Sequence, residues 1–290
     1  MTSMNLEALR NNFKHYILRR VLFRFDFSGM LDTDIEKIIP EIRDKYYSHG
    51  LTHMDLKQVD NLDIKINSGS NIPDNERIAF NSYNKDKVYS FESEEGEVIE
   101  IGRNFFSFCI KDVKEYKSFD KYKNILVKTI MALKNTNTNF FKATRIGLRK
   151  FNSCYLKDIN KLNDYFSNSA FNLNQIKNDL EGFKNISLRL VNFLQKDYFK
   201  VNYCRETIDG FMEESDGKHE SSNLVVTDID VYCDDVVKLT NLLEQEKSIE
   251  KCLNKQNSIE FEVFLSSITK KMIKELSTNN FVNEDIKGVY

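Results

Sequence analysis

The chain contains few residues that break regular structure, and it has no long apolar run. Only two of its 290 residues are proline and ten are glycine, which argues against long flexible linkers. No stretch approaches the roughly 18 apolar residues that a membrane helix needs, and the polar first residues lack the apolar core of a signal peptide. We therefore expect a soluble, cytoplasmic protein with no membrane partner.

The common signatures of metal sites and enzymes are also absent. The five cysteines form no CxxC pair, and the four histidines make no zinc pattern. The sequence has no phosphate-binding GxxxxGK(S/T), dinucleotide-binding GxGxxG, nucleophile-elbow GxSxG or zinc-binding HExxH motif. We expect reduced, structural cysteines, no metal and no cofactor, and we favour a non-catalytic role over an enzyme.

Charge is distributed unevenly along the chain. Residues 206–290 hold 18 acidic residues against nine lysines and no arginine, so their net charge is −9. The whole chain carries −2, which leaves +7 on residues 1–205. One interpretation is a solvated surface of acidic helices. The other is a bipolar molecule that stacks head to tail or offers its basic part to an anion.

The apolar pattern predicts an α+β protein. With 41% hydrophobic residues, a chain of this length can bury a core without disulfides or metals. Helical periodicity alternates with runs of strands, so we expect an antiparallel sheet with helices packed on one face. The strands with the clearest alternation are expected at 17–27, 87–93, 97–102, 104–110, 140–152 and 223–235. A hairpin of two further strands is expected at 185–194 and 198–208.

The order of elements suggests two halves. We expect an N-terminal α+β half over residues 1–153 and a C-terminal α+β half over residues 154–290, either as two similar half-domains or within one compact domain. The second half should end in two helices, the later one starting at Asn257. Residues 49–86 are the least regular part, and turn formers at 67–78 predict an exposed loop.

Arginine is scarce and lies mainly in the predicted strands. The chain has 31 lysines but only 11 arginines. A guanidinium keeps its charge and can hold a carboxylate or phosphate with two parallel bonds, so arginine suits a fixed anion site. Six of the arginines fall in predicted strands: Arg24, Arg103, Arg145, Arg149, Arg189 and Arg205.

The stretch FFKATRIGLRKFN, residues 140–152, places two arginines on one face of a strand. Strand alternation puts Arg145, Gly147 and Arg149 on the same side, and Gly147 leaves a gap that another group can approach. Together with Arg24 and Arg189, these residues form our candidate anion- or partner-binding set.

Three interpretations of the arginines are open at this point. In the first, they pair with Asp26, Asp228 and Asp230 and organise the sheet, each pair contributing about 0.2–1 kcal/mol. In the second, they hold an external anion such as a nucleic-acid backbone, a nucleotide or the carboxylates of a partner. In the third, the aspartates hold a metal in a nuclease-like site, although no lysine or glutamate follows at a diagnostic spacing.

Three stretches resemble a sporadically distributed family of uncharacterised, conserved hypothetical bacterial proteins. They are VLFRFDF (21–27), the Arg-Ile-Gly-Leu-Arg strand motif within residues 140–152, and LVVTDIDVYCDD (224–235). The resemblance spans about residues 17–276 and departs from the family pattern at Lys150, where an aromatic residue is expected. The patchy distribution of that family implies accessory loci, including anti-phage (antiviral) defence.

These observations lead to one expected function and one alternative. We expect a non-catalytic binding protein that acts on a macromolecular partner, as a component of an anti-phage defence or other accessory locus. A protein partner is favoured, nucleic acid is the second choice, and a homodimer is slightly favoured over a monomer. The alternative is a nucleic-acid-directed effector, such as a nuclease, that uses a basic face of the sheet.

Overall fold

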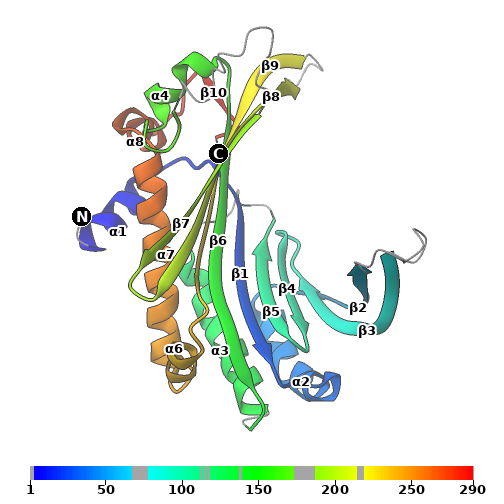
Figure 1. The fold of residues 1–290 in the computed structure, drawn as a ribbon. Coiled ribbons are helices and arrows are strands. Elements are labelled where there is room, and N and C mark those ends of the chain that lie inside the picture. Colours follow the sequence, from blue (N-terminus) through cyan, green and yellow to red (C-terminus); the bar gives the residue numbers. More distant parts are fainter. Residues whose placement is uncertain are drawn as a thin grey trace.

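Within the residues that the structure describes, one antiparallel sheet of ten strands forms the body of the protein (Figure 1). The computed structural model describes residues 3–66, 78–111, 113, 116, 118–136, 139–172, 187–213 and 219–289. The strands are β1 (Leu18–Ser28), β2 (His53–Ile66), β3 (Ile78–Glu92), β4 (Glu97–Gly102), β5 (Phe105–Ile110), β6 (Lys142–Leu156), β7 (Ser187–Lys196), β8 (Phe199–Glu213), β9 (His219–Cys233) and β10 (Ile286–Lys287). Their order across the sheet is β2–β3–β4–β5–β1–β6–β9–β8–β7, and β10 pairs with β6.

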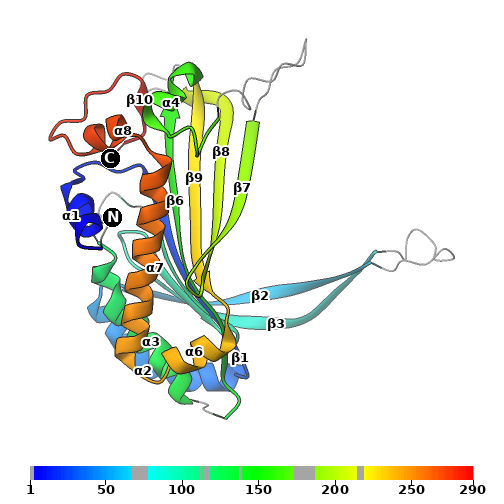
Figure 2. The same cartoon turned by 60° about the vertical axis from the view of Figure 1, so that its left-hand side comes forward.

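Helices cover one face of this sheet (Figure 2). They are α1 (Ser3–Asn12), α2 (Asp32–Ser48), α3 (Asp120–Thr136), α4 (Leu162–Tyr165), α6 (Val236–Leu242), α7 (Glu246–Ser267) and α8 (Lys270–Leu276), with a 3-10 turn, η2 (Ile159–Lys161), before α4. α7 packs across β6 and β9, and α2 packs on α3, β3 and β4. The predicted α+β class with helices on one face is confirmed. None of the described helices is long and apolar enough to cross a membrane.

The central position of β1 follows from its alternating pattern. Val21, Phe23 and Phe25 are fully buried beneath the helices, with 0% of their surface exposed. The residues between them point to the other face and are exposed or half-buried. β1 pairs with β5 on one side and with β6 on the other, so a single sheet continues through both predicted halves of the chain.

A long hairpin of β2 and β3 extends away from the rest of the sheet (Figure 2). The pairing runs from His53 opposite Glu92 to Ile66 opposite Ile78. The prediction of irregular structure over residues 49–86 is therefore wrong for its described parts. Polar residues interrupt the apolar alternation of β2, whereas the backbone hydrogen bonds that pair the strands depend little on side-chain polarity. The loop predicted at 67–78 lies outside the described residues, apart from Ile78.

The C-terminal segment contains more helices than the two predicted, because α6, α7 and α8 precede β10. The predicted helix start at Asn257 is wrong, since this residue lies buried inside α7. Asn257 Oδ1 accepts a hydrogen bond from Lys150 Nζ at 2.8 Å. The neighbouring Gln256 Nε2 donates to the carbonyl oxygens of Ile146 and Val231 at 2.9 and 3.1 Å. These polar side chains bind the sheet from within the helix, so they do not mark its beginning.

All five cysteines are free thiols, as the sequence predicts. Cys109 is half-buried on β5, and the other four are buried. Burial raises the pKa of the Cys154 thiol to about 12, which keeps that thiol protonated and unreactive at neutral pH.

Candidate functional site

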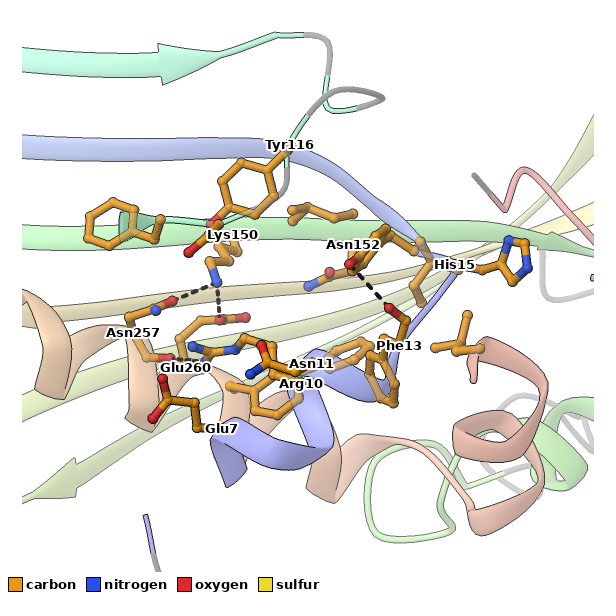
Figure 3. Close-up of a pocket in the computed structure, with 18 of the residues that line it drawn as sticks. Glu7, Arg10, Asn11, Phe13, His15, Tyr116, Lys150, Asn152, Asn257 and Glu260 are labelled. Atoms are coloured by element: carbon orange, nitrogen blue, oxygen red, sulfur yellow. Dashed lines mark hydrogen bonds and ion pairs between the residues drawn. The ribbon is translucent and has the colours of Figure 1, made fainter. Parts of the chain in front are cut away.

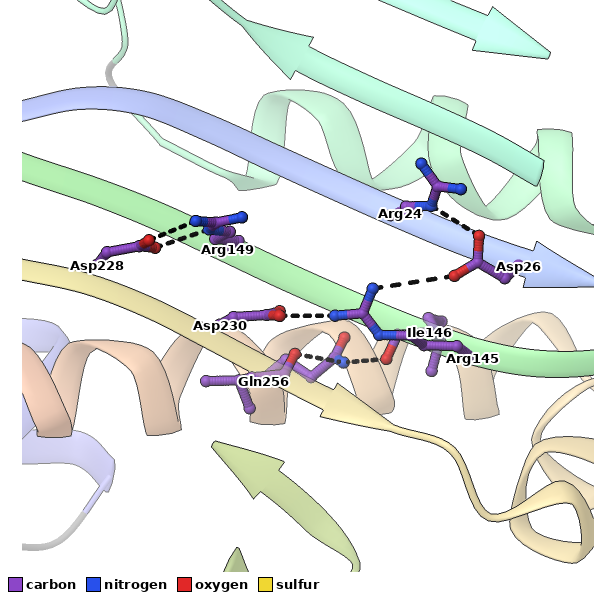
Figure 4. Close-up of polar contacts among 9 residues, drawn as sticks. Arg24, Asp26, Arg145, Ile146, Arg149, Asp228, Asp230 and Gln256 are labelled. Carbon is purple, nitrogen blue, oxygen red and sulfur yellow. Dashed lines mark hydrogen bonds and ion pairs between the residues drawn. The ribbon is translucent and has the colours of Figure 1, made fainter. Parts of the chain in front are cut away.

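The face of the sheet opposite the helices carries most of the predicted site residues. Among the described elements, no helix packs on this face over β1, β6 and β9 (Figure 2). The strand register places Arg24 of β1, Gly147 of β6 and Tyr232 of β9 side by side. Strand alternation places Arg145, Gly147 and Arg149 on the same face of β6. Figure 4 shows the side chains of Arg145 and Arg149 on this face.

A chain of alternating charges crosses three strands on this face (Figure 4). Arg24 Nε donates to Asp26 Oδ1 at 2.7 Å, and Asp26 Oδ2 lies 3.9 Å from Arg145 Nη1. Arg145 Nη2 donates in turn to Asp230 Oδ2 at 2.6 Å. Each guanidinium in the chain therefore has a fixed orientation, set by carboxylates on its own strand and on the neighbouring strands.

A second ion pair joins β6 to β9. Arg149 Nε donates to Asp228 Oδ1 at 2.7 Å, and Arg149 Nη2 donates to Asp228 Oδ2, so two bonds hold the carboxylate. The bond to Asp228 raises the pKa of Arg149. Burial raises the pKa of Asp230, although the nearby guanidinium groups of Arg145 and Arg149 oppose that change. This geometry agrees with the first of the three interpretations, in which the arginines pair with Asp26, Asp228 and Asp230.

Aromatic rings also orient two of the guanidinium groups. Arg24 Cζ lies 4.9 Å from the ring centre of Phe105, and Arg145 Cζ lies 4.7 Å from that of Tyr232. A Cβ added to Gly147 would lie 3.2 Å from Tyr232 Cβ and 3.4 Å from Arg145 Nη2. The gap predicted at Gly147 is thus narrowed by Arg145 and Tyr232, and a larger residue at this position would displace them.

Two hollows join on this face and form what we call the arginine groove. The first has a volume of about 390 Å³ and is lined by Leu22, Arg24, Asp26, Arg145, Gly147, Arg149 and Asp230. The second has a volume of about 330 Å³ and is lined by Arg19, Arg20, Leu22, Arg149 and Phe151. Leu22 and Arg149 belong to both, so the groove is continuous along β1 and β6.

Positive charge is concentrated at the second hollow. Its described lining contains three arginines and no carboxylate. Arg19 Nε and Nη2 donate to the backbone carbonyls of Ser153 and Gly288 at 3.1 and 2.7 Å, which anchors this side chain. Arg20 is exposed, and within the described part of the chain it enters no ion pair. This end of the groove therefore presents guanidinium groups beside the apolar side chains of Leu22 and Phe151.

The remaining strand arginines lie elsewhere. Arg189 is exposed on β7, its Nε donates to Cys204 Sγ at 3.2 Å, and β8 and β9 separate it from β6. Arg103 is not in a strand, because it lies in the turn between β4 and β5, with Nη2 2.9 Å from Asp86 Oδ1. Arg205 points to the helical face, where it is buried and donates to the carbonyl of Ala170 at 3.0 Å. None of the three contributes to the arginine groove.

Four residues of the groove were not predicted from the sequence: Arg19, Arg20, Leu22 and Phe151. A usable signal existed for three of them. Arg20 and Leu22 continue the two-residue spacing of Arg24 and Asp26 along β1, and Phe151 follows Arg149 by two positions along β6. Arg19 is out of phase, and it reaches the groove because the pairing of β1 with β6 shifts between Leu18 and Arg20.

The described residues contain no cluster of three histidine, cysteine or carboxylate side chains that could hold a metal ion. The polar chemistry of this face is thus provided by guanidinium groups and by the aspartates that bind them. Comparison of the chain with family models, curated proteins and solved structures finds no match.

Proposed function

We propose that this chain is a binding protein that docks an acidic segment of a partner protein in the arginine groove. The proposal rests on the face of the sheet that the described helices leave uncovered. On this face, oriented arginines lie beside apolar side chains. Arginine and aromatic residues are enriched at the energetically important centres of protein interfaces.

The groups in the groove are suited to binding. A guanidinium stays protonated at neutral pH, so it holds an anion and does not act as a base. Asp26, Asp228 and Asp230 accept hydrogen bonds from arginines, and their role is to fix the orientation of those arginines before a partner arrives. Such preorganisation lowers the entropy cost of binding.

A protein partner fits this surface better than a nucleic-acid backbone does. The groove arginines and the three aspartates leave a net charge of only +2, and the aspartates would repel consecutive phosphates. An acidic segment that also carries apolar residues could place its carboxylates near Arg20 and its apolar side chains on Leu22 and Phe151. Charge complementarity of this kind sets the specificity and the association rate of protein complexes.

The test compares what the chain captures from native cells with what a groove variant captures. We expect at least one protein to bind both the wild-type chain and the control variant R43Q/K247Q. The variant R20Q/R24Q should not capture this protein, because only these two substitutions remove positive charge from the arginine groove. Treatment of the lysate with nuclease should leave this protein bound. The same set of captured proteins with all three chains would contradict the proposal, and loss on nuclease treatment would favour the nucleic-acid alternative.

We also propose self-association through the edge strand β7, which pairs only with β8 in the described sheet. Phe193 is 78% exposed on β7, and Val191 and Leu194 are exposed as well. An exposed apolar edge is a template for pairing with the same strand of a second copy about a two-fold axis.

Because apolar contacts and backbone hydrogen bonds would hold this dimer, high salt should leave it intact. We expect sedimentation at tens of micromolar protein to give a dimer at low and high salt, and Phe193→Lys to give a monomer. A wild-type monomer at both salt levels would rule out self-association. A dimer that dissociates at high salt would instead indicate attraction between the basic and acidic parts of the chain.

A further inference from the structure

A cavity of about 280 Å³ lies on the helical side of the sheet, on the opposite face of β6 from the arginine groove (Figure 3). It is lined by α1, the start of β1, β6, α7 and the described residues just before α3, and it is partly open to solvent. Its apolar walls include the rings of Phe13, Phe119, Phe261 and Phe264. At this size it is at the lower end of the range for small-molecule sites, about 300–1,000 Å³.

A buried ion pair lies at one wall of the cavity (Figure 3). Lys150 Nζ lies 2.8 Å from Glu260 Oε2, and the two side chains are only 8% and 3% exposed. Burial lowers the pKa of Lys150, Glu260 raises it, and the nearby Arg10 lowers it further. Taking two charges out of water costs several kcal/mol per ion, so their presence beside a cavity requires an explanation beyond packing.

Two further side chains at the cavity each have a buried nitrogen without an acceptor. Arg10 Nη2 donates to the carbonyl of Asn257 at 2.8 Å, and the guanidinium lies 4.4 Å from the ring centre of Phe261. Arg10 Nε is buried and has no hydrogen-bond partner among the described residues. The same is true of Asn152 Nδ2, on a residue that is only 5% exposed. A buried donor without an acceptor destabilises the fold, so a ligand that accepts from it is favoured.

These unmatched groups define the ligand that would complement them. Arg10 Nε and Asn152 Nδ2 are donors, so the ligand must supply acceptors to them. His15 Nε2, which also lines the cavity, is buried without a partner among the described residues and can either donate or accept. Lys150 is matched by Glu260, whereas Arg10 enters no ion pair within the described part of the chain, so the complementary acceptor carries negative charge. The rest of the lining combines aromatic and aliphatic side chains with polar ones that include the carboxylates of Glu7 and Asp120. The ligand must therefore keep its charge at Arg10 and present an apolar body to the rings.

We propose that this cavity binds a small organic acid with an aromatic or aliphatic body. Its carboxylate accepts hydrogen bonds from Arg10 and Asn152, and its body packs against the rings of Phe13 and Phe261, which contact each other with their centres 5.8 Å apart. This site is separate from the arginine groove, and the proposal does not depend on a macromolecular partner.

The test uses thermal unfolding of the full chain with benzoate, phenylacetate and hexanoate, each compared with its neutral amide. At about 100 times its Kd, an acid that fits should raise the Tm by about 5–10 °C, while the matching amide should raise it far less. Arg10→Met and Asn152→Leu should each abolish the shift. The control Arg43→Met, at an exposed site on α2, should retain it.

Unfolding without ligand shows whether the variants are folded. Asn152→Leu removes a buried unmatched donor, so its Tm without ligand should equal or exceed that of the wild type. The comparison of the Tm shifts from each acid and its amide uses only the wild-type chain, so it does not depend on whether the variants fold. The proposal is overturned if no acid shifts the wild-type Tm at millimolar concentration, if acids and amides act equally, or if the shifts persist in both cavity variants.

Discussion

Replacing Lys150 with methionine is expected to lower the free energy of unfolding by about 3–5 kcal/mol, because Glu260 would be left charged and buried without its partner. Asn257 Oδ1 would also lose the hydrogen bond that it accepts from Lys150. The double variant K150M/E260L removes both charges and replaces them with apolar groups. Its stability should return to within about 1–2 kcal/mol of the wild type, since a buried ion pair contributes little over a well-packed apolar pair.

Urea unfolding of K150M, E260L and the double variant K150M/E260L gives the coupling free energy between Lys150 and Glu260. Lys45→Met is the matched control, because Lys45 and Glu41 form an exposed pair on α2 with a separation of 3.3 Å. Lys45→Met should change the free energy of unfolding by less than about 1 kcal/mol. A loss of similar size for Lys150→Met and Lys45→Met would show that the Lys150–Glu260 pair is hydrated and not buried as described.

The second large effect concerns the arginine groove. R20Q/R24Q should weaken partner binding by about 2–3 kcal/mol, which corresponds to a roughly 30- to 150-fold rise in Kd. Arg20 is exposed and Arg24 is 45% exposed, so their replacement leaves the Arg145–Asp230 and Arg149–Asp228 pairs in place. The stability of the free chain should therefore change little.

Titration calorimetry with the captured partner measures this loss. Glutamine keeps the length and polarity of the side chain, so the difference reports the charge. R43Q/K247Q makes the same change of charge at exposed positions outside the groove and should bind like the wild type. Equal affinity of the two double variants would show that net charge, and not the groove, determines binding.

The strands that carry the groove were predictable because their alternation is strong. Phe23 and Phe25 of β1 are buried, and Arg24 between them lies on the other face. The same rule placed Arg145, Gly147 and Arg149 together. Alternation does not report which strands are neighbours. Arg24 lies opposite Gly147, whereas Arg189 lies on a strand three positions from β6, and neither fact follows from local sequence.

The cavity could not be predicted for a related reason. Alternation places Lys150 on the inner face of β6, but a lysine on an inner face usually extends to solvent. Its partner Glu260 is 110 residues away, on a helix whose predicted start fell at Asn257. In the sequence, Asn257 and the residues after it are typical of a helix start. In the structure, Gln256 and Asn257 lie inside α7 and form hydrogen bonds with the sheet.

Arginine-specific chemical labelling with and without the bound partner tests the central claim most directly. Phenylglyoxal reactivity, read out by mass spectrometry, should fall at Arg20 and Arg24 when the partner is added, and should stay unchanged at the exposed Arg43 on α2. Unchanged reactivity of both groove arginines in the complex would contradict the account and place the partner elsewhere on the chain.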